Sequence, residues 1–458
     1  MLTTTPFSDL STRMDGRVLT ASDPDWDAAR QVFNLTTDLQ PDALALPRTV
    51  DDVVAAVDYA RAAGLRVAPQ ATGHNASALG SLEGSLLVDV RELQAIAIHP
   101  SVRRVRVGAG VKWERVTPQL SELGLAALHG SSPDVGIAGY SLGGGMGWLA
   151  RKYGLQANSV TAIELVTADG MPRRVDAENE PDLFWALRGG NGNYGVVTAI
   201  EFEVYPIEDL YAGAMFFPFE QSGEVLHAWA EFLPTLPEEL MTWAKLLQFP
   251  DAPDVPEPVR GGSFAVVMAA FLGGEREGTE LMRPVRDLGP VMDTFRMAAP
   301  AALGDLAMDP EDPLPFASAT AQLSELPSAG VDDLVAAAGP GSGSPLAMVE
   351  LRPMGGALSR PAPGAGARAT LPGNLSIFSL GVTMDEESTA TATEYLEAVE
   401  RAVLPYQCGY YPNFVEAESD ASVFFDAGTW ARLREVKSRY DGDDLFKGNH
   451  HIPPAGAS

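Results

Sequence analysis

The chain has 458 residues, of which 61 are Asp or Glu and 32 are Lys or Arg, so its formal net charge at pH 7 is −29. This length exceeds that of one ordinary hydrophobic core, and two or more domains are expected. An acidic surface repels phosphate backbones and anionic lipid headgroups, which argues against nucleic-acid and membrane partners. In the plainer interpretation, the acids simply keep the protein in solution.

Cysteine and hydrophobic content set further limits. Cys408 is the single cysteine, so neither an intramolecular disulfide nor a Cys-based zinc site can form, and no metal is expected. The first ten residues lack the basic and apolar regions of a signal segment, and no apolar run reaches the roughly 18–20 residues of a spanning helix. A cytoplasmic protein is the simplest expectation. A homodimer is an option on which the sequence is silent.

A helix followed by a strand is predicted early in the chain. From Thr49 onward, apolar residues such as Val53 and Val57 recur at helical spacing, with Thr49 as N-cap and Gly64 beyond the last turn. Further helices are predicted at 25–33, 111–124 and 181–190, and strands at 65–69, 85–90, 96–100, 102–110, 160–170 and 193–207. This alternation with short connectors indicates an α/β arrangement in residues 1–206.

The pattern changes near Pro206. Up to about residue 400, apolar strands alternate with Ala- and Leu-rich helices, and Pro- and Gly-rich loops such as 355–373 interrupt them. The predicted strands lie at 213–219, 264–271, 346–354 and 375–382. A sheet with one face covered by helices fits this pattern, so residues 207–408 are predicted as a second domain. From 409 to 458 the chain returns to a helix and ordered loops.

Glycine dominates residues 130–150, above all between Gly136 and Gly147. Without Cβ atoms, such a backbone can approach a ligand closely and point successive N–H groups at an anion. The spacing is not that of the G-x-G-x-x-G fingerprint, and no Gly-Lys-Ser/Thr ending marks a P-loop. A flexible linker is the alternative, but linkers are polar. Apolar residues flank this cluster instead, namely Val135, Ile137, Leu142, Met146, Trp148 and Leu149. We therefore predict a backbone cradle for phosphates.

A second signal is Thr72-Gly73-His74-Asn75, directly after an apolar strand, where functional residues collect. Taken alone, His74 is more simply interpreted as a surface or hydrogen-bonding residue. Together with the glycine cluster, however, it resembles the berberine-bridge-type FAD-linked oxidases, which share the vanillyl-alcohol-oxidase (PCMH-type) flavin-binding fold. Bacterial members, including oxidases of polyketide pathways, are the most similar. The matching motifs are T-G-H-N at 72–75, P-D-V-G-x-x-G-Y-x-L-G-G-G-M-G-W at 133–148, R-K-Y-G-L at 151–155, D-L-F-W-A-L-R-G-G-x-G-N-Y-G-V-V-T at 182–198, Y-P-N at 411–413, V-K-S-R-Y-D-x-x-x-L-F at 436–446 and I-P-P at 452–454.

The resemblance implies an α+β protein. A two-part PCMH-type FAD-binding domain, residues 1–206 and 409–458, would carry a substrate domain, residues 207–408, with an antiparallel sheet covered by helices. FAD would be bound covalently through the His74 imidazole to the 8α carbon of the flavin. Many relatives add a second link from a cysteine to flavin C6, but here Ser132 stands at that position. A hydroxyl does not replace a thiolate, so attachment through His74 only is expected.

The implied cofactor-binding residues are His74, Gln70, Ala71, Thr72, Gly73, Asn75, Ala78, Leu79, Gly130, Ser131, Ser132, Asp134, Val135, Gly136, Gly139, Tyr140, Gly143, Gly144, Gly145, Gly147, Trp148, Gly195, Val196, Val197, Asn449 and His451. Two of them depart from the family pattern. Gln70 stands where an arginine is usual, which removes a charge near the flavin. His451 stands where an asparagine is common, although Asn449 matches.

Relatives transfer a hydride from a substrate C–H bond to flavin N5 while a base takes a proton from an adjacent O–H or N–H. By motif match, Tyr411 and Asn413 are candidates for the base or for orienting the substrate, and Tyr140 is a candidate for contact with the ring. Glu350 is a candidate carboxylate base, because V-E-L-R places it with Arg352 on one strand face. The alternatives are tyrosines that only pack and a solvated Glu350–Arg352 ion pair worth at most about 1 kcal/mol.

The predicted function is thus an FAD-dependent oxidase of a small organic substrate: an alcohol, an amine, a phenol or a polyketide-type intermediate. O2 would reoxidise the flavin and yield H2O2. Val135 favours O2 over another oxidant, because a small branched residue before this glycine accompanies oxygen access in related plant enzymes. The alternatives are a dehydrogenase with a non-O2 acceptor, a flavin-binding protein without turnover and, from the glycine cluster alone, a non-flavin phosphate-binding module.

Overall fold

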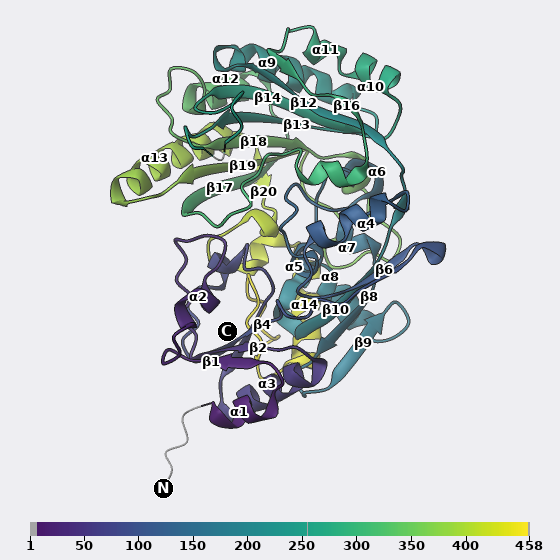
Figure 1. Ribbon diagram of the computed structural model, residues 1–458, viewed down its shortest axis with the longest axis vertical. Coiled ribbons are helices and arrows are strands. Elements are labelled where there is room, and N and C mark those ends of the chain that lie inside the picture. The colour runs from purple at the N-terminus through teal and green to yellow at the C-terminus, as the bar shows by residue number, and fades with distance from the viewer. Residues whose placement is uncertain (1–6, 254, 457–458) are drawn as a thin grey trace.

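The computed structural model describes residues 7–253 and 255–456. Figure 1 shows two stacked parts: the lower one contains both the purple N-terminal and the yellow C-terminal segments, and the upper one is a wide sheet from the middle of the chain. Two terminal stretches lie outside the described residues, namely 1–6 and 457–458. The first belongs to the N-terminal stretch predicted to lack a signal, and the second belongs to the predicted C-terminal part. Among the described helices, none is both long and apolar enough to cross a bilayer.

Two small sheets form the lower part. In the first, of order β1-β2-β4-β3, β4 pairs in parallel with both β2 and β3. Its strands are β1 (Arg17–Leu19), β2 (Ala43–Leu46), β3 (Arg66–Gln70) and β4 (Ser85–Asp89). The second sheet is antiparallel, in the order β5-β6-β10-β8-β9. Its strands are β5 (Ile96–His99), β6 (Arg104–Gly108), β8 (Val160–Val166), β9 (Pro172–Asp176) and β10 (Val196–Glu203), and a short pair joins β7 (Leu125–Ala126) to β11 (Tyr205–Pro206).

Helix α3 (Val50–Ala63) shows how the sequence encodes this part. It begins at a capping box in which the Thr49 side chain accepts from the backbone N–H of Asp52, and it ends at Gly64, whose φ of 71° suits glycine. Val53 and Val57 on its buried face belong to the core shared with both lower sheets. The predicted helix is therefore confirmed. The other lower helices are α1 (Ser8–Arg13), α2 (Trp26–Arg30), α4 (Thr117–Ser121), α5 (Ile137–Gly143), α6 (Ala150–Tyr153), α7 (Gln156–Ser159), α8 (Pro181–Gly190) and α14 (Ala427–Tyr440).

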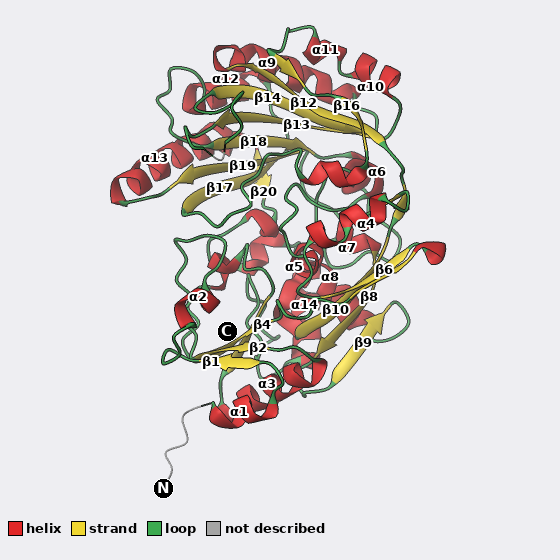
Figure 2. Cartoon of the chain, in the orientation of Figure 1, coloured by secondary structure: helices red, strands yellow, loops and turns green. Residues whose placement is uncertain are grey.

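The upper part is a nine-stranded antiparallel sheet in the order β15-β12-β14-β13-β18-β19-β17-β20, with β16 also paired to β12. Its strands are β12 (Leu210–Pro218), β13 (Leu240–Gln248), β14 (Ser263–Phe271), β15 (Met292–Asp293), β16 (Arg296–Ala298), β17 (Phe316–Leu323), β18 (Met348–Pro353), β19 (Leu375–Val382) and β20 (Gln407–Gly409). Helices cover its outer face, at the top of Figure 2. They are α9 (Ser222–Phe232), α10 (Glu275–Leu281), α11 (Arg283–Arg286), α12 (Ser328–Ala338) and α13 (Glu386–Val403).

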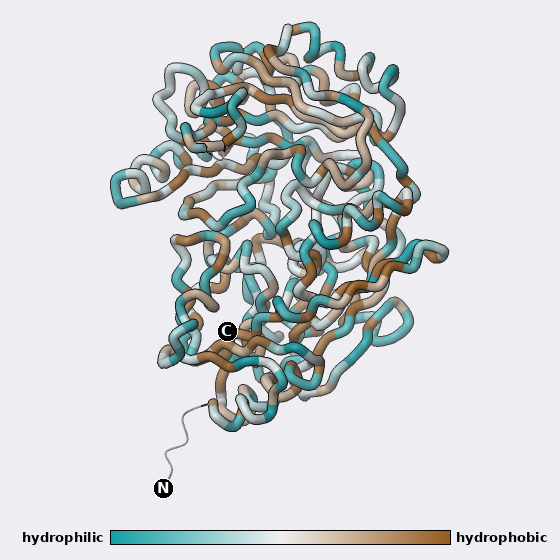
Figure 3. Tube along the Cα trace, in the orientation of Figure 1, coloured by the Kyte–Doolittle hydropathy of each residue, from teal (hydrophilic) through white to brown (hydrophobic). Residues whose placement is uncertain are grey.

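The two faces of the upper sheet serve different purposes. On β18, Val349 and Leu351 belong to the core beneath the helices. Because successive side chains point to opposite faces, Glu350 and Arg352 face the lower part of the molecule. Brown segments follow the strands in Figure 3, whereas the outer helices show more teal. One strand therefore contributes both to a hydrophobic core and to the contact between the two parts.

The C-terminal segment completes the lower part. Its backbone lies beside β3, where the N–H of Val67 donates to the carbonyl of Leu445 at 2.8 Å. The Lys437 side chain of α14 is fully buried, donates to the Asn193 carbonyl at 2.7 Å and forms an ion pair with Asp441. Residues 437–445 are thus held by contacts with the first 200 residues.

This architecture confirms the α+β class, but two details of the prediction are wrong. The helix expected over 111–124 is a short turn at Trp113–Arg115 followed by α4, because Pro118 cannot donate the backbone hydrogen bond that a continuous helix needs. Strands β13 and β17 were not predicted, since Lys245 interrupts the apolar run of the first and small residues dominate the second. The domain limits at 206/207 and 408/409 stay a prediction; the strands of the upper sheet extend from Leu210 to Gly409.

We expect Lys437→Met to destabilise the protein by about 3–5 kcal/mol, because it leaves the buried Asp441 carboxylate without its counter-charge. Arg439→Met is the matched control. Arg439 lies two residues away on the same helix, and its ion pair with Asp182 is about half exposed and contributes little to stability. Urea unfolding followed by circular dichroism measures both. Equal shifts of the two midpoints would show that the buried pair does not anchor the C-terminal segment.

Candidate active site

A deep cavity lies where the upper sheet meets the lower part. The lower part contributes the loop after β3, the glycine-rich segment around α5 and the turn before β10, and the upper part contributes β18, β19 and the segment 309–316. The segments 411–416 and 449–450 complete the lining. The predicted residues that line it are Gln70, Ala71, Thr72, Gly73, His74, Asn75, Leu79, Gly130, Ser131, Ser132, Val135, Gly136, Gly139, Tyr140, Gly195, Val196, Val197, Tyr411, Asn413 and Asn449. The predicted residues that lie outside the lining are Ala78, Asp134, Gly143, Gly144, Gly145, Gly147, Trp148, Glu350 and His451.

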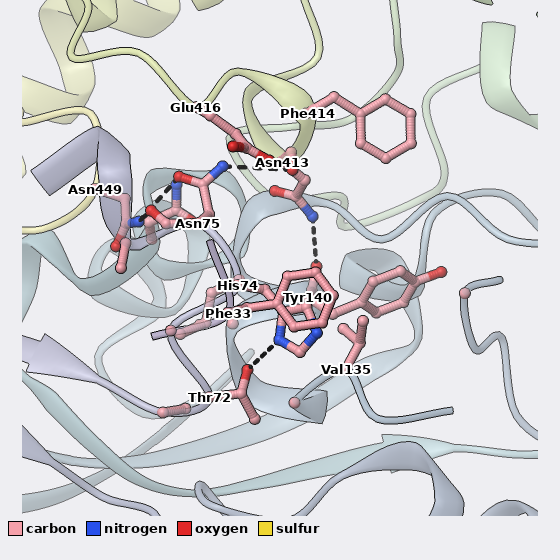
Figure 4. Close-up of a pocket in the computed structure, with 18 of the residues that line it drawn as sticks. Phe33, Thr72, His74, Asn75, Val135, Tyr140, Asn413, Phe414, Glu416 and Asn449 are labelled. Atoms are coloured by element: carbon pink, nitrogen blue, oxygen red, sulfur yellow. Dashed lines mark hydrogen bonds between the residues drawn. The ribbon is translucent and has the colours of Figure 1, made fainter. Parts of the chain in front are cut away.

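His74 lies on the cavity wall and is held from three sides. Its Nδ1 is 2.9 Å from the Thr72 hydroxyl and its Nε2 is 2.9 Å from Asp134. Its ring stacks on Phe33 with 4.3 Å between centroids, as Figure 4 shows. The turn that presents it needs glycine at position 73, where φ is 74°. The simpler interpretation of His74 as a hydrogen-bonding residue fits these contacts, and its role in binding the cofactor stays a prediction.

The glycine-rich segment is an ordered wall and not a flexible linker. Gly136 contacts Thr72 so closely that a Cβ atom there would lie 3.0 Å from the Thr72 side chain. At Gly147 a Cβ atom would lie 1.8 Å from the backbone carbonyl oxygen of His129. Some glycines, such as Gly139, thus expose their backbone to the cavity. Others allow the segment to fold tightly behind the cavity wall.

Two residues that line the cavity contain buried polar atoms without a side-chain or backbone hydrogen-bond partner among the described residues. Gln70 donates to Asp89 at 3.0 Å, but its Oε1 is buried and has no hydrogen-bond partner among the described residues. The same holds for Nδ1 of His450. Buried polar atoms without partners are costly, and both residues line the cavity. Bare glycine backbone together with these atoms fits a large polar cofactor such as FAD.

His450, which the sequence did not single out, takes the place expected for His451. The His451 side chain turns away and bonds to Asp444 at 3.1 Å. Trp148 likewise lies in the core, stacked on Trp243 with 3.5 Å between centroids. Both differences arise from the local path of the backbone, which a motif does not specify.

Tyr411 is almost fully buried at the end of the cavity nearest the glycine segment. Its hydroxyl oxygen accepts the backbone N–H groups of Gly145 at 2.8 Å and Met146 at 3.1 Å. Burial raises the pKa of Tyr411 to about 12, against the opposite effect of these two N–H groups. Because its oxygen receives two hydrogen bonds, its own proton is free to be donated elsewhere.

Asn413 and Tyr140 meet beside it. The Asn413 amide donates to the backbone carbonyl of Tyr140 at 3.1 Å (Figure 4). The Tyr140 hydroxyl donates to the Leu128 carbonyl at 3.1 Å, and burial raises its pKa well above the usual value. Tyr140 is thus a neutral wall residue with a satisfied hydroxyl.

A cluster of four charged residues lies on the upper wall. Glu350 is fully buried, pairs with Arg352 and lies 2.9 Å from the Lys245 ammonium, which also binds Asp309 at 2.9 Å. The solvated ion pair considered from the sequence is therefore wrong, because both partners are buried. Arg352 and Asp309 line the cavity, whereas Glu350 lies behind Arg352. The Arg352 guanidinium lies 3.8 Å from the centroid of the Trp243 ring.

Glu416 is a candidate that the sequence did not reveal. It lines the cavity and accepts from the Asn34 amide at 3.1 Å. Burial raises the pKa of Glu416 to about 7, against the opposite effect of this hydrogen bond. Three positions after Asn413, it belongs to no pattern that would separate it from a surface acid.

Comparisons with known proteins also indicate an FAD-binding protein. The profile of a family described as an FAD binding domain matches residues 41–176. A relative from Paenarthrobacter nicotinovorans, (R)-6-hydroxynicotine oxidase, is 29% identical over 97% of this chain and 98% of its own length. Xylooligosaccharide oxidase of Thermothelomyces thermophilus is 30% identical over 45% of this chain and 42% of its own. Among solved structures, Physcomitrella patens BBE-like 1 superposes on this chain with a TM-score of 0.84 at 22% identity. The superposition covers 99% of this chain and 100% of that chain.

The fold and the cavity define an FAD-binding oxidoreductase. The FAD-binding profile over residues 41–176 and the end-to-end similarity to an oxidase support the resemblance to berberine-bridge-type FAD-linked oxidases, and the chain shares the fold of Physcomitrella patens BBE-like 1. The predicted resemblance is thereby confirmed. An enzyme of this class acts on a small molecule.

Glu416 makes stability depend on pH. Its pKa is about 7 in the folded protein against an ordinary value of 4.5, so the folded state holds the proton more tightly. This contribution is fully present below pH 4.5 and is lost as the pH rises through 7, a change of up to about 3 kcal/mol. We expect Glu416→Gln to flatten the fall in melting temperature between pH 5 and 8, whereas the exposed Glu418→Gln leaves it unchanged. Parallel curves for all three proteins would contradict the raised pKa.

Proposed function

We propose that this protein is an oxidase that takes a hydride from a small organic substrate onto FAD attached to His74 alone, and passes the electrons to O2. The observation that carries the proposal is His74, held on the cavity wall opposite the substrate sheet with both ring nitrogens in hydrogen bonds. The substrate class is an alcohol, an amine, a phenol or a polyketide-type intermediate. A cytoplasmic location and a role in secondary metabolism belong to the same proposal.

In this proposal, the glycine segment receives the phosphates of FAD on bare backbone, and Gln70 and His450 supply the polar atoms that are unpaired in the protein alone. Bound FAD supplies the two-electron acceptor. Asn75 and Asn449, which hydrogen-bond to each other at 3.0 Å, close the cavity beside His74. The remaining predicted cofactor residues outside the lining would shape the backbone of this wall.

Tyr411 is the proposed base or hydrogen-bond partner of the substrate. The two N–H groups at its oxygen stabilise a phenolate, as the donors of an oxyanion hole do. Asn413 orients the adjoining wall through Tyr140. We propose that Glu350 acts through Arg352, which it holds against Trp243, because Arg352 and not Glu350 lines the cavity.

Support for O2 as the oxidant comes from Val135 and from the relatives. Val135 lines the cavity with a small side chain, and the two relatives named above are called oxidases. The second candidate is a dehydrogenase with another acceptor. Stoichiometric H2O2 formation under air supports the oxidase, and substrate turnover without H2O2 supports the dehydrogenase.

We expect acid-precipitated protein to retain its flavin, and peptide mass analysis to find the flavin on the His74 peptide and not on the Ser132 peptide. His74→Ala removes the nucleophile, so the variant should release all its flavin into the acid supernatant. His99→Ala, at an exposed position, is the matched control and should retain it. Flavin on the Ser132 peptide would overturn attachment through His74 only.

We expect Tyr411→Phe to slow flavin reduction by about 10²–10⁴-fold, the usual contribution of general acid–base catalysis. With a pKa of about 12 in the folded protein, the phenolate fraction rises with pH, so the wild-type rate should rise from pH 7 to 10 and the Phe variant should lose this slope. Tyr205→Phe is the control, since its hydroxyl bonds to Ser159 away from the cavity. Anaerobic stopped-flow absorbance measures all three. An unchanged slope in Tyr411→Phe would remove Tyr411 as the base.

A further inference from the structure

His74 is fixed by a chain of polar contacts that reaches out of the cavity. Asp134 lies behind it, only 4% exposed, and its Oδ2 is 2.9 Å from His74 Nε2. The other carboxylate oxygen, Oδ1, accepts the Ser132 hydroxyl at 2.6 Å. On the far side of the ring, the Thr72 hydroxyl lies 2.9 Å from Nδ1 (Figure 4). The series Ser132–Asp134–His74–Thr72 therefore begins and ends at residues that line the cavity and passes behind the wall at Asp134.

The charge of Asp134 decides which ring nitrogen carries the proton. Burial raises the pKa of Asp134. The hydrogen bond from His74, the charge that this ring carries when protonated, the hydrogen bond from Ser132 and the positive charge of Lys112 lower it more, so the pKa lies below the ordinary value. The group is thus an ionised acceptor at neutral pH. A carboxylate can only accept from imidazole, so Nε2 bears the proton, and in the neutral ring Nδ1 keeps its lone pair.

The ring is also held in one plane. Phe33 stacks on it at an interplanar angle of 17°, and the contacts at both nitrogens limit its rotation. The Thr72 hydroxyl donates to the Nδ1 lone pair, a bond that rotation of the hydroxyl releases. His74 is therefore oriented and in the tautomer that a nucleophile needs.

We propose that Asp134, oriented by Ser132, is the positioning residue that makes His74 Nδ1 the nucleophile in the protein's own covalent attachment of FAD. The inference rests on the proposed covalent link through His74 and adds to it the residue that drives its formation. The arrangement follows the logic of a Ser-His-Asp triad, in which a buried aspartate fixes the histidine tautomer and stabilises its cationic form.

The reaction balances with O2 as the oxidant. The Nδ1 lone pair forms a bond to the 8α carbon of the flavin, one C–H bond of that methyl group breaks, and its electron pair remains on the ring system as two-electron reduced flavin. The positive charge that develops on the imidazole is stabilised by Asp134 until the Nε2 proton leaves. O2 then takes the two electrons and two protons and becomes H2O2. FAD, histidine and O2 thus yield histidyl-FAD and H2O2.

Asp134→Asn tests the proposal because it keeps the shape and removes the charge. The asparagine amide can donate to Nε2, which moves the ring proton to Nδ1 and blocks the lone pair. The matched control is Asp332→Asn, since Asp332 forms the same kind of contact, 2.8 Å from Nε2 of His227, on the exposed surface of the upper part.

The experiment reconstitutes the full-length apoprotein with FAD under air. Tight binding is followed by flavin fluorescence, and covalent attachment by in-gel fluorescence after denaturation. We expect Asp134→Asn to bind FAD with a Kd within about threefold of wild type and to attach it at least about 100-fold more slowly. Asp332→Asn should match wild type in both measurements.

Each outcome decides one question. If wild type itself attaches no flavin, the covalent link in the proposed function fails. If wild type attaches flavin and Asp134→Asn does so at the same rate, the link stands and the inference is overturned. Loss of FAD binding together with attachment would show a merely structural role and also overturn it.

Ser132→Ala keeps the test decisive if Asp134→Asn does not fold. It leaves the carboxylate in place and removes one hydrogen bond, so attachment, measured on the FAD-bound fraction, should slow by about 3–10-fold, as expected for a loss of about 1 kcal/mol. An unchanged attachment rate in this variant would overturn the role of the Ser132–Asp134 contact.

Discussion

The structure depends on a short polar segment, residues 411–416, that connects three distant stretches of chain. Tyr411 accepts the N–H groups of the glycine segment, the backbone carbonyls of the segment accept from Asn75, and Glu416 accepts from Asn34. Each bond is made in or beside the cavity, where an unpaired polar group would be expensive. The glycines of this segment have no side chains with which to fix its conformation. The C-terminal segment supplies the fixed points instead.

In the charged cluster on the upper wall, buried polar groups are likewise paired within the protein. Lys245, Asp309, Glu350 and Arg352 carry two positive and two negative charges and lie within one connected set of contacts. Buried charges are tolerated when they are paired and hydrogen-bonded, whereas removal of one partner is strongly destabilising. The wall therefore offers the substrate an Arg352 guanidinium whose orientation is set before binding. Pre-organised groups of this kind avoid a cost of reorganisation during the reaction.

The His74 environment is assembled from stretches that lie far apart in the chain. Thr72 is two residues away from His74 in the chain. Asp134 lies 60 positions after His74, near the start of the glycine-rich stretch 130–150. The isolated bridge between Lys112 and Gly136 brings that segment to the lower sheet. Ser132, which stands at the position where the resemblance implied a second link, here contacts Asp134 behind His74. In the proposed scheme, this position orients His74 instead of attaching the cofactor.

The sequence by itself determined the local elements with clear periodicity and caps, such as α3, and the two motifs that line the cavity. It also determined that Ser132 offers no thiolate, because residue type alone decides that chemistry. Only the tertiary structure decided that Glu350 is a buried partner of Arg352, that Glu416 faces the cavity and that His450 takes the place expected for His451. The physical reason is the same in each case. Alternation along a strand or loop separates two faces, but which face meets solvent, protein or ligand depends on segments hundreds of residues away.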